Sequence, residues 1–397
     1  MLVRKHFLSK LTRLGSISSA VSLGCLLVVF GSTAGTIKVG MSTALEGPAS
    51  GLGTNVKAGV ESYFKMVNDA GGVNGNKLEL IAINDGYEPG KAANNTRALI
   101  NDHNVVAMIG NVGTPTAVVT VPIANELKVP LIGAVTGAGL LRQSPPDRYI
   151  INYRASYAQE TAAMIDGLLG SGIKPEEIAF FTQKDGYGDA GYNGGVSALK
   201  SHGFTDIGSI AHGRYERNTT NVEDGLITVL DAEVEPKAII MVGAYKPCAE
   251  FISLAQEELP DALFLNVSFV GSVSLMKELG EKSEGVIITQ VVPHYEADLP
   301  TVNEFRASLS SYNNSVPPSF LALEGYLAAK ILVDGIKSKS GILNSEDIVN
   351  GIQSLRNFDL GIGTKNMLDA THHQASNDVW PTQIKGGQFV KLNWSEL

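Results

Sequence analysis

The stretch from residue 105 to residue 136 constrains the fold more than any other part of the chain. It reads as a short apolar strand, Val105–Gly110, then a loop broken by glycine, a helix, and a second apolar strand, Pro130–Val135. Thr114 followed by Pro115 is typical of a helix start, with a hydroxyl cap and proline at the first helical position. A helix between two short strands predicts parallel pairing, and therefore an α/β sheet.

This stretch also predicts a binding site for an anion. Thr114 follows the first strand and Thr136 follows the second, so both hydroxyls lie beyond the carboxyl ends of neighbouring strands. Ligands of open α/β sheets bind at that edge, and a helix N-terminus there favours negative charge. The alternative is that Thr114 only caps its helix, which is a common role for threonine.

The rest of the chain repeats the alternation of strands and helices in two consecutive series, which predicts two parallel-sheet domains. Further strands are expected at 37–45, 77–84, 178–182, 207–211, 238–242, 262–269 and 285–291. Helices are expected at 53–70, 92–103, 159–169, 190–202, 221–230, 248–258, 273–279, 321–337 and 345–355. The tail from Phe358 is expected to form short strands and loops.

The N-terminal segment, residues 1–34, is different in kind. Four basic residues precede an apolar heart, Ala20–Phe30, and small residues follow it, which predicts a secretory signal peptide cleaved before Gly35. An uncleaved anchor is the alternative, but 11 apolar residues are short for a span of about 20. A lipid-modified Cys25 is a second alternative, although the apolar run continues beyond it.

Charge and cysteine content limit the partners of the exported chain. Removal of residues 1–34 takes the formal charge from −9 to −13, which argues against nucleic acid and anionic lipid as partners. Cys248 is then the only cysteine, so no internal disulfide is expected. No other stretch is long and apolar enough to span a membrane, so we expect a periplasmic protein without stable membrane insertion.

Motifs for cofactors and catalysis are weak or absent. The sequence GYGDAG, from Gly186 to Gly191, matches a dinucleotide fingerprint, but no acidic residue ends the following strand as that site requires. We expect instead a turn that projects Tyr187 over a cleft. With no phosphate-binding loop, no metal-spaced Cys/His set and no nucleophile motif, we expect no cofactor, no metal and no enzymatic activity. Tyr153, Arg154 and Tyr157 are interpreted as core residues and a solvated face.

The order of these pieces resembles the branched-chain amino-acid (Leu/Ile/Val) binding proteins of bacterial ABC importers. The segments that carry the resemblance are IKVGMSTALEGPASGLG, GGVNGNKLELIAINDGYEP and MIGNVGTPTAVVTVPIANELKVPLIGA. The resemblance implies a type I periplasmic binding fold, in which two Rossmann-like lobes with parallel sheets are joined by three hinge crossovers, here near Tyr153, Val291 and Leu360. It places 35–153 plus 292–360 in lobe 1 and 154–291 plus 361–397 in lobe 2.

The resemblance also implies which residues bind the ligand. Thr114, Ala134 and Thr136 match positions that hold a carboxylate, and Tyr187 and Tyr245 match lobe 2 tyrosines. Leu52 replaces an aromatic residue, and Ser268 stands where the family has an acid that pairs with the α-ammonium of the ligand. The expected ligand-binding set is Leu52, Thr114, Ala134, Thr136, Tyr157, Tyr187, Tyr245 and Ser268, with Phe269 beside it.

From these observations we expect a monomeric solute-binding protein that closes on a small carboxylate, an amino acid or close relative, and delivers it to an ABC transporter permease. The alternatives are a sensor module for aromatic or aliphatic carboxylates that docks on a receptor or kinase, and a secreted α/β enzyme. Since a serine carries no charge, we expect tolerance of, or preference for, acids that lack an α-ammonium. Asp185, Asp189 and Glu324 are the alternative partners for an ammonium.

Overall fold

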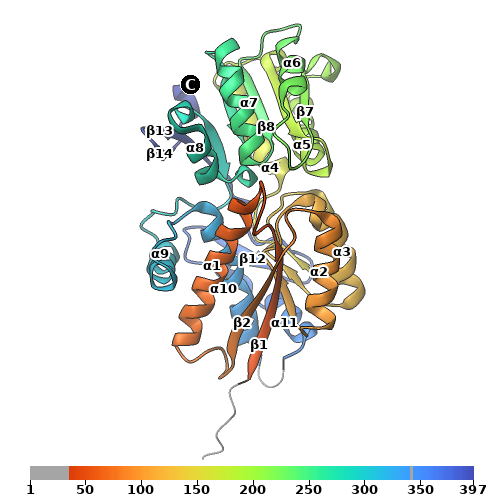
Figure 1. Ribbon diagram of the computed structural model, residues 1–397, viewed down its shortest axis with the longest axis vertical. Helices are drawn as coiled ribbons and strands as arrows, with labels where there is room; N and C mark the ends of the chain where they lie inside the picture. Colours follow the sequence, from red (N-terminus) through yellow and green to blue (C-terminus); the bar gives the residue numbers. More distant parts are fainter. Residues whose placement is uncertain (1–34, 340–342) are drawn as a thin grey trace, which may run out of the picture. The chain divides into compact units, whose positions relative to one another are not determined.

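The computed structural model describes residues 35–339 and 343–397, which contain two main β-sheets (Figure 1). The predicted signal peptide lies outside the described residues. The first sheet has five parallel strands in the order β2-β1-β3-β4-β5. Its strands are β1 (Thr36–Thr43), β2 (Lys77–Asn84), β3 (Ala107–Ile109), β4 (Leu131–Ile132) and β5 (Ile150–Ile151).

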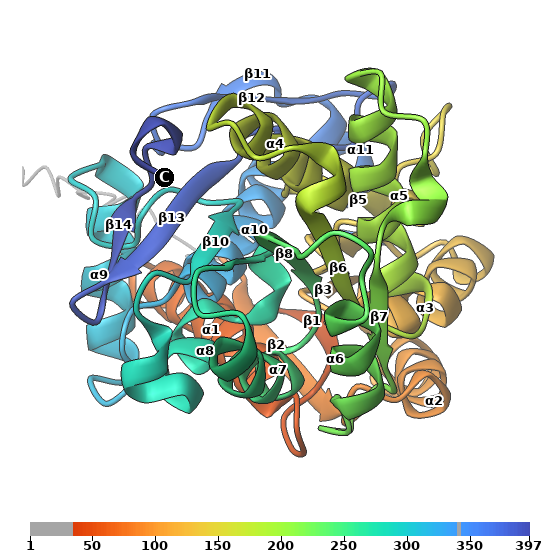
Figure 2. The same cartoon turned by 90° about the horizontal axis from the view of Figure 1, so that it is seen from above.

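The second sheet has seven strands in the order β14-β13-β10-β9-β8-β6-β7. Its strands are β6 (Ile178–Gln183), β7 (His212–Tyr215), β8 (Ala238–Val242), β9 (Leu263–Asn266), β10 (Ile287–Gln290), β13 (Trp380–Lys385) and β14 (Gln388–Lys391). Strands β6 to β10 pair in parallel, whereas β13 and β14 add an antiparallel edge. Figure 2 shows β8, β6 and β7 side by side in this sheet.

The α-helices that accompany the two sheets include the crossovers that parallel pairing requires. They are α1 (Ser50–Asp69), α2 (Pro89–Asn101), α3 (Thr114–Leu127), α4 (Tyr157–Gly170), α5 (Gly186–Ser201), α6 (Glu223–Leu230), α7 (Tyr245–Glu258), α8 (Ser272–Leu279), α9 (Pro300–Tyr312), α10 (Phe320–Lys337) and α11 (Ser345–Gln353). Helices α1 and α10 pack side by side, as Figure 1 shows. A Cβ on Gly59 would lie 1.9 Å from the Ala322 carbonyl oxygen, so this crossing requires glycine.

Three local predictions are corrected by the structure. The strand expected at 207–211 is wrong: Ile207–Ser209 is a 3-10 helix, and the strand begins at His212, where alternate residues become buried. Helix α5 begins at Gly186, so GYGDAG forms its first turns and is not a separate turn. Helix α9 was not predicted from the sequence.

The topology confirms the predicted fold class, an α/β fold with two Rossmann-like lobes built on largely parallel sheets. In the first sheet the strand order reverses between β1 and β3, and in the second it reverses between β6 and β8. Ligands of such sheets bind at the carboxyl ends of the strands beside the reversal. Residues 110–114, 184–187 and 243–245 follow β3, β6 and β8, which lie beside the reversals, and residues 133–137 and 267–269 follow the next strands, β4 and β9. Together these segments include most of the predicted site.

Candidate functional site

The predicted anion site contains two threonine hydroxyls in direct contact. The Thr114 and Thr136 Oγ1 atoms are 2.6 Å apart, and both residues are buried. Thr114 does not cap α3 as predicted; it is the first residue of the helix, and Gly113 occupies the cap position. Gly113 has a φ of +100°, and a Cβ there would lie 2.1 Å from the Tyr87 ring. Glycine therefore moves the cap back by one residue and frees the Thr114 hydroxyl to face Thr136.

The threonine pair has one hydroxyl hydrogen to spare. The Thr136 hydroxyl accepts a hydrogen bond from the Ala138 amide at 3.2 Å, and the pair shares one hydrogen between its two oxygens. Since two hydroxyls carry two hydrogens, one O–H remains available as a donor. Thr136 belongs to a tight turn, because its amide donates to the Ala134 carbonyl at 2.8 Å. A spare donor near the N-terminus of α3 suits a carboxylate.

Aromatic rings pack together next to this pair. The Tyr157 ring centroid lies 5.0 Å from that of Tyr187 and 6.5 Å from that of Phe269, and Tyr187 and Phe269 are 4.6 Å apart. Burial raises the pKa of Tyr157 to about 12, although Arg154 opposes the shift, so this hydroxyl stays protonated. Tyr187 donates its hydroxyl to the Gly243 carbonyl at 3.2 Å. These rings form an apolar wall beside a polar pair, as small-ligand sites require.

Leu52 and Tyr245 lie at a second contact, between the chain segments that form the two sheets. The Gly51 amide, in the first turn of α1, donates to the Tyr245 hydroxyl at 3.3 Å. A Cβ on Gly271 would lie 2.6 Å from Leu52 Cδ2 and 3.7 Å from Tyr245 Cδ1. The structure thus brings Leu52 and Tyr245 together, and their packing leaves Gly271 no room for a side chain.

Ser268 belongs to a buried charged cluster that sequence reasoning missed. Arg154 was interpreted as part of a core or solvated face, but it is fully buried and its Nη2 donates to the Ser268 hydroxyl and to Glu160. Glu160 Oε2 accepts from the Ser268 amide and from Thr289 Oγ1, both at 2.7 Å. Its Oε1 accepts from the Ser268 hydroxyl at 3.0 Å and from Arg154 at 3.3 Å. An arginine next to a predicted hinge was the one available signal.

Two further charges complete this cluster. Glu324 Oε1 lies 3.6 Å from Arg154 Nη1, and Arg142 donates from Nη2 to the Arg154 carbonyl at 2.9 Å and from Nη1 to the Thr136 carbonyl at 3.2 Å. Burial raises the pKa of Glu160 and of Glu324, and Arg154 opposes both shifts. Burial lowers the pKa of Arg142 to about 10. Arg142 therefore stays charged and holds the Thr136 turn close to Arg154.

The two aspartates considered as partners for a ligand ammonium have structural partners instead. Asp185 caps α5 by accepting from the Tyr187 amide at 2.9 Å, and it accepts from Gln183 at 2.7 Å. Asp189 is half exposed and pairs with Arg214 at 2.6 Å. Glu324 is therefore the candidate acid that remains close to the site.

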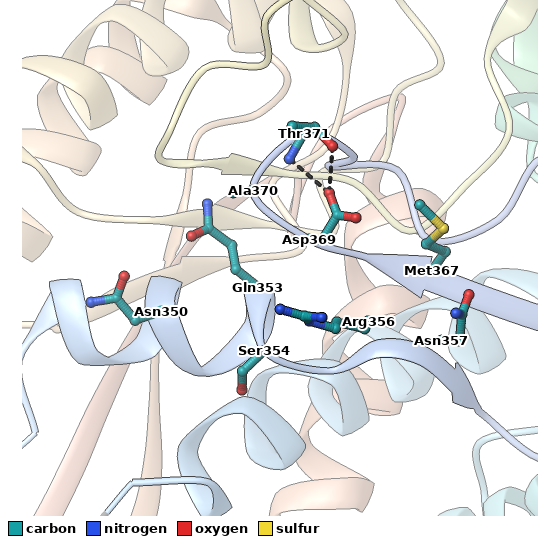
Figure 3. Close-up of a pocket in the computed structure, with 9 residues that line it drawn as sticks. All are labelled: Asn350, Gln353, Ser354, Arg356, Asn357, Met367, Asp369, Ala370 and Thr371. Atoms are coloured by element: carbon teal, nitrogen blue, oxygen red, sulfur yellow. Dashed lines mark hydrogen bonds between the residues drawn. The ribbon is translucent and has the colours of Figure 1, made fainter.

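A separate hollow of about 650 Å³ lies between α11 and the hairpin of β11 (Arg356–Asp359) and β12 (Lys365–Leu368). Figure 3 shows its lining, where both the amide and the hydroxyl of Thr371 donate to Asp369. None of the predicted site residues lines it. Within residues 35–339 and 343–397 there is no helix long and apolar enough to cross a membrane, and no cluster of three metal-ligating side chains.

Comparison with known proteins agrees with this architecture. Residues 36–388 match the family model described as periplasmic binding protein. The chain is 46% identical to the crystal structure of a possible leucine/isoleucine/valine-binding protein from Rhodopirellula baltica, with a TM-score of 0.89, over 92% of this chain and 98% of that one. It is 23% identical to the leucine-, isoleucine-, valine-, threonine- and alanine-binding protein of Pseudomonas aeruginosa, over 90% and 94% of the two chains.

A solute-binding protein of an ABC transporter from R. palustris in complex with benzoate has the same fold. It is 19% identical, with a TM-score of 0.78, over 90% of this chain and 96% of that one. These relatives are ligand-binding proteins of a family without enzymatic activity. The solved structures confirm the predicted type I periplasmic binding fold.

Proposed function

We propose, from the premise that this chain belongs to the periplasmic binding protein family, that it captures a small carboxylate in a hinged cleft and delivers it to an ABC importer. The family establishes a periplasmic solute-binding protein. The proposal adds the ligand class, the site residues and the importer. The observation that carries it is the Thr114–Thr136 pair, with its spare O–H next to the N-terminus of α3.

The mechanism that we propose is closure of two lobes around the ligand. Lobe 1 would include residues 35–153 and lobe 2 residues 154–291, as predicted. The last change of lobe is placed after Ser376 and not at Leu360, because β11 pairs with β12 and the amides of Ala375 and Ser376 donate to the Asn152 and Tyr153 carbonyls. The chain then enters the second sheet at β13. Thr114, Thr136 and the turn at Ala134 would bind the carboxylate. Tyr157, Tyr187, Phe269, Leu52 and Tyr245 would enclose the body of the ligand, which stabilises the closed state by its differential affinity.

The proposal includes export of the chain to the periplasm and its partners there. A signal peptide over residues 1–34 would direct the chain to the periplasm, where the mature monomer would meet the permease of its importer. Relatives of this chain include a protein named for five amino acids and one that holds benzoate, so acids with and without an ammonium are both candidate ligands. The carboxylate is the group that these ligands share.

The test removes one hydroxyl from the threonine pair. Thr114→Val should weaken binding of the tightest acid in a panel of leucine, valine, phenylalanine and their deaminated acids by about ten- to a hundredfold, because a hydrogen bond to a charged group is worth about 1.5–3 kcal/mol. Thr136→Val should weaken binding by a similar factor. Isothermal titration calorimetry, on protein unfolded and refolded to remove any carried ligand, gives the affinities.

The matched control is Thr120→Val in the same helix. The Thr120 hydroxyl is buried and has no hydrogen-bond partner in the described part of the chain, so its removal should leave affinity unchanged within about twofold. Unchanged affinity in both pair variants would contradict the site. Equal binding of an acid and its amide would contradict the carboxylate.

A further inference from the structure

We propose that Arg154 is the second anchor of the cleft and selects acids with a neutral acceptor, an α-oxo or α-hydroxy oxygen, over acids with an α-ammonium. The inference rests on the proposed function and deepens it by naming the class of acid. It rests on the hydrogen bonds that a cluster of buried side chains makes and leaves unmade. We call this cluster the guanidinium cluster; it consists of Arg142, Arg154, Glu160, Ser268 and Glu324.

Arg154 is fully buried with unfilled donors. Its Nη2 is used by Glu160 and the Ser268 hydroxyl, but Nε and Nη1 have no hydrogen-bond partner in the ranges 35–339 and 343–397. The nearest carboxylate oxygen to Nη1, on Glu324, is at 3.6 Å, beyond hydrogen-bond distance. A buried donor without a partner costs free energy, so these N–H groups favour a ligand that brings an acceptor.

Glu160 cannot serve as the partner of an ammonium. Its two oxygens already accept four hydrogen bonds, from the Ser268 amide, the Ser268 hydroxyl, Thr289 and Arg154. A carboxylate has about four lone-pair sites, so this one is filled. Glu160, the acid that contacts Ser268, is therefore fully used by hydrogen bonds within the protein, and it holds Arg154 in place.

Glu324 remains, and its surroundings also disfavour an ammonium. The guanidinium of Arg154 faces it, so an ammonium between the two would meet a like charge. The cluster contains two guanidinium groups and two carboxylates and is balanced without a ligand. A ligand carboxylate at the threonine pair already adds one negative charge. A second negative group would move the charge further from balance, which favours an oxo or hydroxy oxygen over a second carboxylate.

The position of Arg154 allows it to act together with the aromatic wall. Its Cζ lies 5.7 Å from the Tyr157 ring centroid, and Arg142 links the Arg154 backbone to the Thr136 turn. In the proposed complex the acid places its carboxylate at the threonine pair, its second oxygen toward Arg154, and a branched or aromatic body against Tyr187 and Phe269.

The experiment compares four acids with one carbon skeleton: leucine, its α-oxo analogue, its α-hydroxy analogue, and isocaproate, which has neither group. Calorimetry on the refolded mature chain should give affinities for the α-oxo and α-hydroxy acids at least about tenfold tighter than for leucine or isocaproate, as a bond to a charged donor predicts. Phenylalanine and its α-oxo analogue repeat the comparison with a larger body.

Two variants separate recognition from structure. Arg154→Lys keeps the charge and removes Nε, so it should weaken the α-oxo acid about tenfold and leave isocaproate within about threefold. A merely structural role would weaken both acids equally. Glu324→Gln should not weaken the α-oxo acid, because it removes a negative charge that faces Arg154 and the proposal gives Glu324 no contact with the ligand.

The outcomes are distinct. Leucine binding more tightly than its α-oxo analogue, with loss of leucine binding in Glu324→Gln, would overturn the inference and make Glu324 the ammonium partner, while the proposed function would stand. Equal weakening of the α-oxo acid and isocaproate in Arg154→Lys would also overturn it. Failure of every acid to bind would overturn the proposed function and this inference together.

Discussion

The threonine pair and the guanidinium cluster hold polar groups by opposite means. At the pair, two neutral hydroxyls are positioned by backbone, with Gly113 in a glycine conformation and one O–H left over. In the cluster, full charges are positioned by side chains, and every lone pair of Glu160 is in use. Burying a hydrogen-bonded neutral hydroxyl costs little free energy, whereas burying a charge costs much more unless an opposite charge and hydrogen-bond partners are buried with it. Changes at the pair should therefore affect binding first, and changes in the cluster should affect folding first.

The largest expected effect is that of Glu160→Gln, which tests the folding side of this comparison. The change leaves Arg154 buried without its hydrogen-bonded anion, and breaking a buried pair costs about 3–5 kcal/mol. Urea unfolding followed by circular dichroism, without ligand, measures the loss. Glu126→Gln is the control, because its pair with Arg97 is exposed and screened by solvent, so its loss should leave stability nearly unchanged. A loss below about 1 kcal/mol for Glu160→Gln would remove the distinction between the two regions.

The next effect is that of Gly113→Ala, which tests the claim that backbone positions the threonine pair. Alanine would have to adopt a φ of +100° and would meet the Tyr87 ring at 2.1 Å. Strain and overpacking together should cost about 2–5 kcal/mol of the free energy of unfolding, and ligand affinity should fall as well. Gly90→Ala, in the first turn of α2, has no atom within 4 Å and should be neutral or stabilising by up to about 1 kcal/mol. Equal stabilities for the two variants in urea would contradict the prediction.

The smallest effect is that of Tyr245→Phe, which lies outside both regions. It removes only the 3.3 Å hydrogen bond from the Gly51 amide, worth about 0.5–1.5 kcal/mol. If the bond helps to hold the closed state, affinity for the tightest acid of the panel should fall about two- to tenfold by calorimetry. Tyr192→Phe, at a ring that stacks on His212, is the control and should bind normally. A loss of a hundredfold would instead mean that the Tyr245 hydroxyl binds a polar group of the ligand and not the Gly51 amide.

Local signals in the sequence anticipated much of the fold and part of the site. Apolar runs bounded by glycine and proline located most strands and helices, and the strand ends located Thr114 and Thr136. The cap of α3 was placed one residue late, because threonine before proline is a familiar helix start while the need for glycine comes from Tyr87, distant in the chain. The strand expected at 207–211 was misplaced because a short apolar run does not distinguish a strand from a turn of helix.

The sequence by itself determined the alternation of strands and helices, the positions of the strand ends, and the family that their order resembles. Each of these depends on residues that are close together in the sequence. Only the tertiary structure decided that Arg154 is buried and which groups it contacts. Glu160 lies 108 residues from Ser268 and 129 from Thr289, and strand pairing brings them together. From sequence alone an arginine is expected to be charged and exposed. Its burial becomes favourable only when the folded chain supplies a counter-charge and hydrogen-bond acceptors. The same packing fills the four acceptor sites of Glu160 and leaves two nitrogens of Arg154, Nε and Nη1, without an acceptor.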